Sequence, residues 1–224
     1  MDRRGMLSNF FSSYAGAKAL PEYAVKRFLR QCGLSAPKGV FVPRGVPLPD
    51  LSNLTFPVVA KVSSSQIRSK SDVDGLRLGL ADTKAVETAI SELMVIEQAE
   101  GALVEEQAAP GVEVIIGGIT DPQFGPVVMF GLGGVFVELF HDVAFAPAPM
   151  TRDDAFRLVR RVTAYRLLTG YRGKPPCDME ALAGILVTVS ELMATGLLEE
   201  IDLNPVVLYP HGAMILDAKM MVAS

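Results

Sequence analysis

Helical and extended hydrophobic patterns alternate along this chain of 224 residues. Apolar side chains recur three and four positions apart in residues 21–31 and again in residues 83–99, and this spacing predicts two one-faced helices. Short apolar and β-branched runs predict five strands, at residues 56–62, 102–107, 112–119, 127–130 and 135–140. The alternation predicts a mixed fold in which neither helices nor strands dominate.

Capping residues predict two further helices in the second half of the chain. Thr151 precedes a helical pattern that runs to Gly170, with Asp153 and Asp154 in its positive first turn. Asp178 precedes an apolar stripe at helical spacing that ends before Gly196. Strands that come in runs, followed by helices, predict two α+β lobes that meet near residues 104–111, rather than one doubly wound sheet.

Composition excludes several classes of protein. A net charge of -4 provides no broad basic field for nucleic acid. Every apolar run is cut by Gly, Pro or a charge well short of the roughly 18 residues that span a membrane. The only cysteines, Cys32 and Cys177, show neither disulfide nor zinc spacing. Residues 1–18 lack the continuous apolar stretch of a secretory signal, so we expect a flexible leader on a cytoplasmic chain.

The last forty residues contain candidate ligands for a hard cation. Asp202 and Asn204 share one face of a predicted strand, and residues 206–208 and 213–216 predict a hairpin. If its turn pairs Asn204 with Asp217, oxygen donors from neighbouring strands converge, which suits magnesium. A one-residue slip of register would move Asp217 to the opposite face, and an ordinary polar strand end also explains the pattern.

Three other segments contain polar groups that suit a nucleotide, each with a plainer explanation. Lys61 lies near the end of a buried strand, where a phosphate would compensate its charge; it can equally reach solvent at the strand edge. Backbone groups of residues 105–107 can contact an adenine edge, or their carboxylates can simply face water. The glycine-rich segment 131–134 allows N–H groups to approach an anion, although a tight turn explains it as well.

Read in order, these segments form a recognisable series of motifs. The most specific stretch is residues 121–134, Asp-Pro-Gln-Phe-Gly-Pro-Val-Val-Met-Phe-Gly-Leu-Gly-Gly. The other motifs are spread along the chain, at residues 20–23, 70–73, 137–138, 142–145, 171–173, 202–205 and 216–218. From Leu20 to Ala218 the sequence resembles the ATP-grasp domain of the NDP-forming acyl-CoA synthetases, the ADP-forming acetyl-CoA synthetase and succinyl-CoA synthetase β-subunit type.

The resemblance implies an α+β ATP-grasp fold of two lobes with the nucleotide cleft between them. The leader would be residues 1–18, the N-terminal lobe with its first helix residues 19–107, and the C-terminal lobe residues 108–224. The implied contacts to ATP or ADP come from both lobes, and the candidates are Lys61 at the phosphates, Glu105, Glu106 and Gln107 as the adenine hinge, Glu113 near the ribose, and Gly133 and Gly134 in the glycine loop. Asp202, Asn204 and Asp217 would surround Mg²⁺.

The resemblance also implies an activity, that of an ADP-forming acid–CoA ligase. Phosphoryl would pass between Mg-ATP or ADP and a phosphohistidine on a CoA-binding α-type subunit or domain, with a small carboxylic acid and CoA as further substrates. The sequence has no Gly-rich strand–turn–helix fingerprint of a CoA-binding half. We therefore expect a subunit of a hetero-oligomer, without nucleic acid or membrane partners.

Three positions depart from the family pattern. Ser69 replaces a histidine proposed to relay phosphate, and Asp74 replaces a glycine. Ala146 replaces an arginine whose N–H groups would donate hydrogen bonds to a phosphate. The two histidines present, His141 and His211, lie outside the relay motif and are expected at the surface. Two hypotheses follow: an active β-type subunit, or a catalytically degenerate ATP-grasp module that acts as nucleotide sensor or scaffold.

Overall fold

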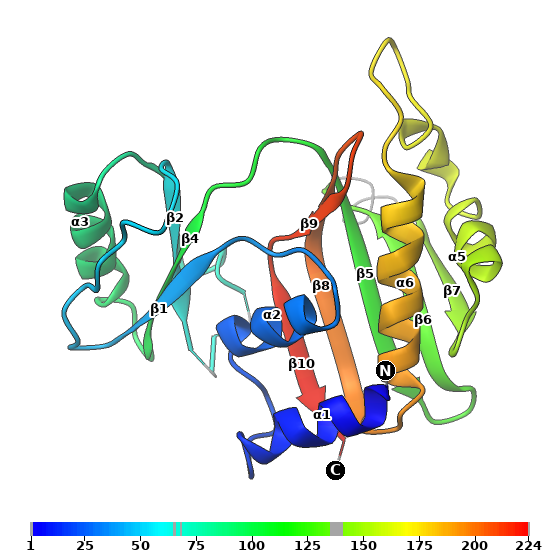
Figure 1. The fold of residues 1–224 in the computed structure, drawn as a ribbon, viewed down its shortest axis with the longest axis horizontal. Coiled ribbons are helices and arrows are strands. Elements are labelled where there is room, and N and C mark those ends of the chain that lie inside the picture. Colours follow the sequence, from blue (N-terminus) through cyan, green and yellow to red (C-terminus); the bar gives the residue numbers. More distant parts are fainter. Residues whose placement is uncertain (1, 65, 68, 135–140, 224) are drawn as a thin grey trace. The chain divides into compact units, whose positions relative to one another are not determined.

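The computed structural model describes residues 2–64, 66–67, 69–134 and 141–223. The chain forms two compact units, which we describe separately. Unit 1 comprises Met1–Leu20, Val25–Ala36 and Pro110–Ser224, and unit 2 comprises Pro21–Ala24 and Pro37–Ala109. Each unit combines helices with an antiparallel sheet (Figure 1), so the predicted α+β class is confirmed. The predicted strand at residues 135–140 lies outside the described residues.

Unit 2 is built on a sheet with the strand order β1-β4-β2-β3. Its elements are β1 (Gly39–Pro43), β2 (Val58–Ser63), β3 (Leu76–Leu80), α3 (Thr83–Leu93) and β4 (Gly101–Glu106). The helix α3 buries Val86, Ala89 and Leu93 in a core shared with alternate residues of β2, including Val58 and Ala60. The apolar face of α3, formed by residues at helical spacing, therefore packs on the apolar face of β2, formed by every second residue.

Unit 1 is built on a second sheet with the order β10-β8-β5-β6-β7, and β9 also pairs with β8. Its strands are β5 (Val112–Asp121), β6 (Gly125–Leu132), β7 (Val143–Pro147), β8 (Leu198–Leu208), β9 (Ala213–Ile215) and β10 (Ala218–Val222). Its later helices are α5 (Arg152–Val159), the 3₁₀ helix η1 (Thr163–Leu167) and α6 (Met179–Met193). In Figure 1, α6 crosses the sheet over β5 and β6, and its apolar stripe is buried there.

The helix predicted from Thr151 to Gly170 is two shorter helices. Thr151 begins α5 with a capping box that includes Asp154, as its sequence indicates. The helix ends because Val162 adopts an extended backbone and buries its side chain in the core. The carboxylate of Asp142 then accepts the N–H groups of Thr163 and Ala164, 2.8 and 2.9 Å away, at the start of η1.

The prediction that residues 1–18 form a flexible leader is wrong. Residues Arg3–Ser12 form a helix, α1, in which Leu7 is fully buried in the core of unit 1. The ring of Phe10 stacks on that of Phe28, with 4.6 Å between centroids. These apolar contacts order the segment, although its helical periodicity is too weak to predict it.

The assignment of the first helix to the N-terminal lobe also needs correction. This helix, α2 (Glu22–Gln31), places Val25, Phe28 and Leu29 in the core of unit 1, and only its first turn groups with unit 2. The chain passes from unit 2 to unit 1 between Ala109 and Pro110. The sequence predicted this junction two residues earlier, between residues 107 and 108. Within the described ranges, no helix is both long and apolar enough to cross a membrane.

Asp178 connects α6 to the turn between β8 and β9. One carboxylate oxygen accepts the N–H of Ala181, 2.9 Å away, and the other accepts the N–H of Gly212, 2.8 Å away. These two N–H groups stabilise the ionised form and hold the pKa of Asp178 below its ordinary value of 3.8. The helix cap therefore also fixes the hairpin that carries β9.

We predict that Asp178→Ala lowers stability by about 1 kcal/mol, the usual contribution of a helix cap, or about 2–4 °C in melting temperature for a chain of this size. Because the pKa of Asp178 is depressed on folding, the difference from wild type is full above pH 4 and disappears as the pH falls through the folded-state pKa. Thermal melts of both proteins between pH 2 and 7 measure it.

Glu180→Ala is the matched control for this prediction. Glu180 lies in the same helical turn, and its ion pair with Arg152 is at the surface, with the two side chains 70% and 59% exposed. Exposed pairs of this kind contribute little to stability. An equal loss of stability in both variants would contradict the capping role of Asp178.

Candidate functional site

The structure resolves the register on which the predicted metal site depends. Ala218 pairs with Leu203, and the backbone N–H of Asn204 donates to the carbonyl of Asp217, 3.3 Å away. Asp217 therefore lies opposite Asn204, as the sequence analysis required. Leu203 and Ala218 are fully buried, whereas Asn204 is exposed and Asp217 half-buried, so the polar residues occupy the face away from the core.

Asp202 completes this set, which we call the acidic strand set (Asp202, Asn204 and Asp217). It lies two residues before Asn204 on β8, which places it diagonally across from Asp217 on the same face. Its direct cross-strand neighbours are Gly117 on β5 and Lys219 on β10. Since Gly117 has no side chain, the sheet leaves space beside the carboxylate of Asp202.

A cavity of about 280 Å³ opens beside Asp202 within unit 1. It is lined by Gly117 and by apolar side chains from β5, β6 and β7, among which Ile119 and Phe145 are exposed. Glu200 also lines the cavity, so its apolar surface ends at two carboxylates, which suits a ligand with one apolar and one positively charged part. A second cavity, of about 440 Å³, lies beside α6 and contains none of the predicted site residues.

The acidic strand set has the chemistry of a magnesium site, although it is not a complete one. Two carboxylates and an amide supply oxygen ligands, which Mg²⁺ prefers, and Mg²⁺ usually keeps waters and substrate phosphates as its other ligands. The Oδ1 atom of Asp217 is buried and accepts no hydrogen bond in the described structure, while the residue takes part in other interactions. The described residues contain no cluster of three His, Cys, Asp or Glu side chains that could hold a metal alone.

The remaining predicted residues of unit 1, Glu113, Gly133 and Gly134, lie together at the start of β5 and the end of β6. The N–H of Gly133 donates to the carbonyl of Glu113, 2.8 Å away. A Cβ at Gly133 would come within 3.0 Å of the Cβ of Glu113, and Gly134 has a positive φ of 61°. Both glycines therefore have a structural reason to be present, and the N–H of Gly133 is engaged within the chain.

In unit 2, Lys61 has carboxylate partners rather than access to solvent. Its side chain is only 10% exposed, and its Nζ lies 2.9 Å from Glu105 and 3.4 Å from Glu22. The second carboxylate oxygen of Glu22 lies 2.9 Å from the Nζ of Lys70. These four residues form a buried charge network in which the signs alternate. The alternative of a lysine reaching out of the strand edge is therefore wrong.

Strand pairing explains how this network forms. Val59 on β2 pairs with Glu105 on β4, so Glu105 and Lys61 lie on the same face, opposite the α3 core. Gly39 on β1 pairs with Glu105 from the other side, and a Cβ there would come within 2.6 Å of the Glu105 side chain. The missing side chain of Gly39 thus leaves the space that Glu105 occupies.

Glu106 and Gln107, predicted to contact adenine, hold neighbouring segments of unit 2 in place. Their N–H groups donate to the carbonyls of Lys38 and Pro57, 2.9 and 3.0 Å away. Their side-chain oxygens accept the N–H groups of Thr55 and Gly79. These bonds engage both N–H donors that a base edge would use, so an adenine contact at this segment would have to use its carbonyl groups.

Sequence reasoning missed three charged residues: Glu22, Lys26 and Lys70. Glu22 and Lys26 fall on the apolar side of α2, where Lys26 is 1% exposed. A charged residue within the apolar stripe of a predicted helix is the signal that could have identified Glu22 and Lys26. Lys70 begins the motif at residues 70–73, and Glu22 lies in the motif at residues 20–23, but the sequence assigned no role to either side chain.

The structure also locates the three departures from the family pattern. Ser69 is half-buried, and Asp74 is an exposed residue whose carboxylate pairs with Arg77, 3.2 Å away. Ala146 packs against the core of unit 1, so an arginine at this position would begin on the helix-covered face. His141 and His211 are both exposed, as expected.

Comparison with known proteins identifies the family. The sequence profile of the ATP-grasp domain matches residues 13–222. The chain belongs to the ATP-grasp family. Its α+β units are thus the ATP-grasp fold, as the sequence predicted.

The relatives of this ATP-grasp chain include ADP-forming acetate–CoA ligases. The β subunit of ligase II from Pyrococcus furiosus is 36% identical over 219 residues, which cover 92% of this chain and 93% of that protein. Ligase II from Archaeoglobus fulgidus is 39% identical over 204 residues, 91% of this chain but 30% of that protein. The chain therefore spans a β subunit almost completely and under a third of the longer ligase.

Solved structures give the same relationship. Acetyl-coenzyme A synthetase 1 of Ca. Korarchaeum cryptofilum was solved with coenzyme A and Mg-AMPPCP, and with its phosphohistidine segment pointing towards the nucleotide binding site. Its matching chain is 39% identical to this ATP-grasp chain with a TM-score of 0.81, and the match covers 99% of this chain and 100% of that one.

We predict that Glu105→Gln destabilises unit 2 by roughly 3–5 kcal/mol, because it leaves the buried ammonium of Lys61 without its nearer carboxylate. Glu106→Gln is the matched control, since Glu106 is adjacent but only half-buried, and glutamine keeps the oxygen that accepts the N–H of Thr55. Urea unfolding of both variants measures the difference. Equal stability of the two variants would show that the network contributes little.

Proposed function

We propose that this chain is the nucleotide-binding β-type subunit of an ADP-forming acyl-CoA synthetase. It would transfer phosphoryl between Mg-ATP or ADP and a phosphohistidine on a CoA-binding partner, with a small carboxylic acid and CoA as the other substrates of a hetero-oligomer. The observation that carries the proposal is the placement of Asp217 opposite Asn204, on the same face as Asp202, in a chain whose relatives are ADP-forming acetate–CoA ligases.

The proposal assigns roles to residues of each unit taken by itself. In unit 1, Asp202, Asn204 and Asp217 would hold Mg²⁺ through oxygen atoms, and Glu113, beside Gly133 and Gly134, would lie near the ribose. The bound ion would supply positive charge to the transferring phosphoryl oxygens. Gly133 and Gly134 would let the backbone approach the nucleotide closely.

In unit 2, Lys61 would bind the phosphates and residues 105–107 would form the adenine hinge. Glu105 and Glu22 hold the Lys61 ammonium in one position, so a phosphate would meet a fixed charge rather than a mobile side chain. Such preorganised charge is the main contribution that a protein makes to phosphoryl transfer. The hinge would offer carbonyl groups, since the N–H groups of Glu106 and Gln107 are engaged.

Phosphoryl transfer itself would need only one nucleophile from the partner. A nitrogen of the partner's histidine would form a P–N bond as the γ-phosphoryl group leaves the oxygen of ADP, and the reverse step would regenerate ATP. The relay histidine is Ser69 in this chain, so we propose direct transfer. The alternative, a degenerate sensor or scaffold, is favoured by Ser69, Asp74 and Ala146. The carboxylate of Asp74 pairs with Arg77, which also pairs with Glu92, and Ala146 faces the core.

We predict that ADP binds with magnesium and only weakly without it. Without the cation, the carboxylates of Asp202 and Asp217 would repel the phosphates directly. Asp217→Ala should therefore reduce the Mg²⁺-dependent gain in ADP affinity several-fold, as measured by calorimetry with Mg²⁺ and with EDTA. Glu199→Ala, which removes a partly exposed carboxylate from the same strand, should leave the gain unchanged. Equal affinity with and without metal in the wild type would refute the site.

We also predict that the chain alone forms no acyl-CoA, and that acid-labile label from γ-labelled ATP appears on an added CoA-binding partner. Ser69→His should change the labelling little if transfer is direct. Phosphate analysis of both proteins after mixing measures this. Label that reaches the partner only with Ser69→His would favour the relay, and turnover by the lone chain with acetate and CoA would refute the subunit proposal.

A further inference from the structure

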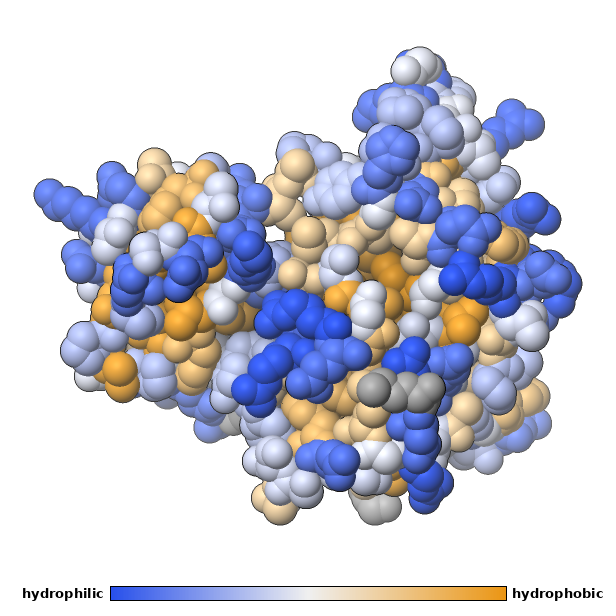
Figure 2. Space-filling view, in the orientation of Figure 1, coloured by the Kyte–Doolittle hydropathy of each residue, from blue (hydrophilic) through white to orange (hydrophobic). Residues whose placement is uncertain are grey.

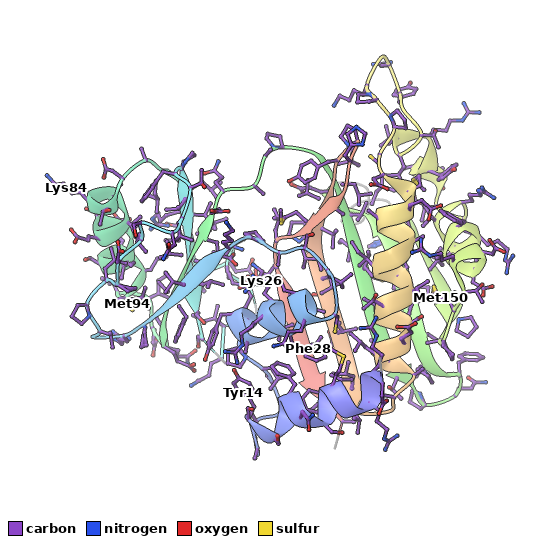
Figure 3. The ribbon with its side chains drawn as sticks, viewed as in Figure 1. Tyr14, Lys26, Phe28, Lys84, Met94 and Met150 are labelled. Atoms are coloured by element: carbon purple, nitrogen blue, oxygen red, sulfur yellow. The ribbon has the colours of Figure 1, made fainter. Side chains whose placement is uncertain are left out.

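Lys26 is the most completely buried charged residue in the part of the chain that the structure describes. It lies on α2 (Figure 3), where its side chain is 1% exposed among the apolar residues of the core of unit 1. The next residue, Arg27, is exposed, and the outward face of α2 is hydrophilic in Figure 2. A buried ammonium group is costly unless its donors are used, so the partner of Lys26 has a strong influence on local structure.

The Nζ of Lys26 donates to the backbone carbonyl of Leu216, 2.5 Å away. This carbonyl occupies a position in the sheet where the usual donor is absent. Leu216 donates its own N–H to the carbonyl of Pro205, 2.9 Å away, and in an antiparallel pair residue 205 would return a bond from its N–H. Proline has no N–H. Lys26 therefore replaces the hydrogen bond that Pro205 cannot make.

The position of this bond relates Lys26 to the acidic strand set. Leu216 immediately precedes Asp217, in the two-residue gap between the end of β9 at Ile215 and the start of β10 at Ala218. Ile215 donates its N–H to the carbonyl of Ser35, 2.9 Å away, just after α2. The segment that presents Asp217 is thus held by α2 and the residues after it as well as by β8.

We propose that Lys26 is a positioning residue for the magnesium site. Its ammonium group fixes the Leu216–Asp217 backbone, so that the carboxylate of Asp217 stays beside Asn204 and on the face of Asp202. The inference rests on the proposed function, because it requires that these three residues bind the cation. Residues that orient metal ligands without touching the metal typically contribute 10–100-fold to metal affinity.

The test compares three variants of the full chain. Lys26→Met keeps the length and apolar character of the side chain but cannot donate, and Lys26→Arg keeps both donor and charge. Arg27→Met is the matched control, because it removes the same charge from the exposed side of the same helix. For each protein, calorimetry measures ADP affinity with Mg²⁺ and with EDTA, and electron paramagnetic resonance measures Mn²⁺ bound to the protein–ADP complex.

We expect Lys26→Met to lower the metal-dependent gain in ADP affinity by roughly 10–100-fold and to weaken Mn²⁺ binding equally. Affinity for ADP in EDTA should stay unchanged, Arg27→Met should behave as wild type, and Lys26→Arg should recover most of the gain. An unchanged gain in folded Lys26→Met would overturn the proposal. Equal losses with and without metal would also overturn it, since they indicate a general structural role.

Two further comparisons keep the result decisive. If circular dichroism shows that Lys26→Met does not fold, Lys26→Leu, which also has no donor, carries the test with the same expected loss and the same contrary outcome. Failure of the proposed function has a different signature, because the wild type would then show no metal-dependent gain. A gain that disappears in Asp217→Ala and survives in Lys26→Met refutes the role of Lys26 alone.

Discussion

The pairing of β8 with its neighbours is the constraint on which the candidate site depends. This strand contacts β5 on one side and both β9 and β10 on the other, so its register determines which residues of three other strands share a face. Core residues such as Ile201 and Leu203 anchor that register, because a shift by one residue would expose them and bury Asp202. The positions of the polar residues thus follow from the burial of their apolar neighbours.

Buried charges make a second kind of contribution in both units. In unit 2, Glu22 and Glu105 surround Lys61, and in unit 1, Lys26 binds a backbone carbonyl. Apolar residues would fill these places at lower desolvation cost, and a buried ion pair is weak evidence for stability. What such groups provide is a fixed direction for a charge or a fixed segment of backbone. Both suit the proposed function, in which phosphate and metal must be placed accurately.

Much of the fold was predictable because its elements have strong periodicity or clear caps. The spacing of apolar residues identified α2, α3 and α6. Thr151 and Asp178 were predicted as caps, and α5 and α6 begin at the residues that directly follow them. The strands β1, β3, β7 and β10 and the helix α1 were missed. The sequence of β3, Leu-Arg-Leu-Gly-Leu, alternates between apolar and other residues, so its signal was present but not used. The helix α1 is ordered by tertiary contacts of Leu7 and Phe10 rather than by its own pattern.

The candidate site was predictable to a smaller extent. Sequence identified Asp202, Asn204 and Asp217 from alternation and turn position, but could not choose the register, which depends on long-range pairing. It placed Lys61 on a buried strand but could not find Glu22, which lies 39 residues earlier and meets Lys61 only in the folded chain. For Gly133, a local reason for glycine, its close approach to Glu113, competes with the proposed contact to a ligand.

Gly39 has a consequence for engineering this protein. Because any side chain there would collide with Glu105, a search for stabilising substitutions should leave this position unchanged, even though a strand glycine is normally an attractive target. Gly184 on α6 is the opposite case, since a Cβ there meets no atom within 4 Å and alanine in a helix is favoured over glycine by about 1 kcal/mol. Rigidity can thus be added on the helical layer of unit 1 while the charged face of the smaller sheet is left as it is.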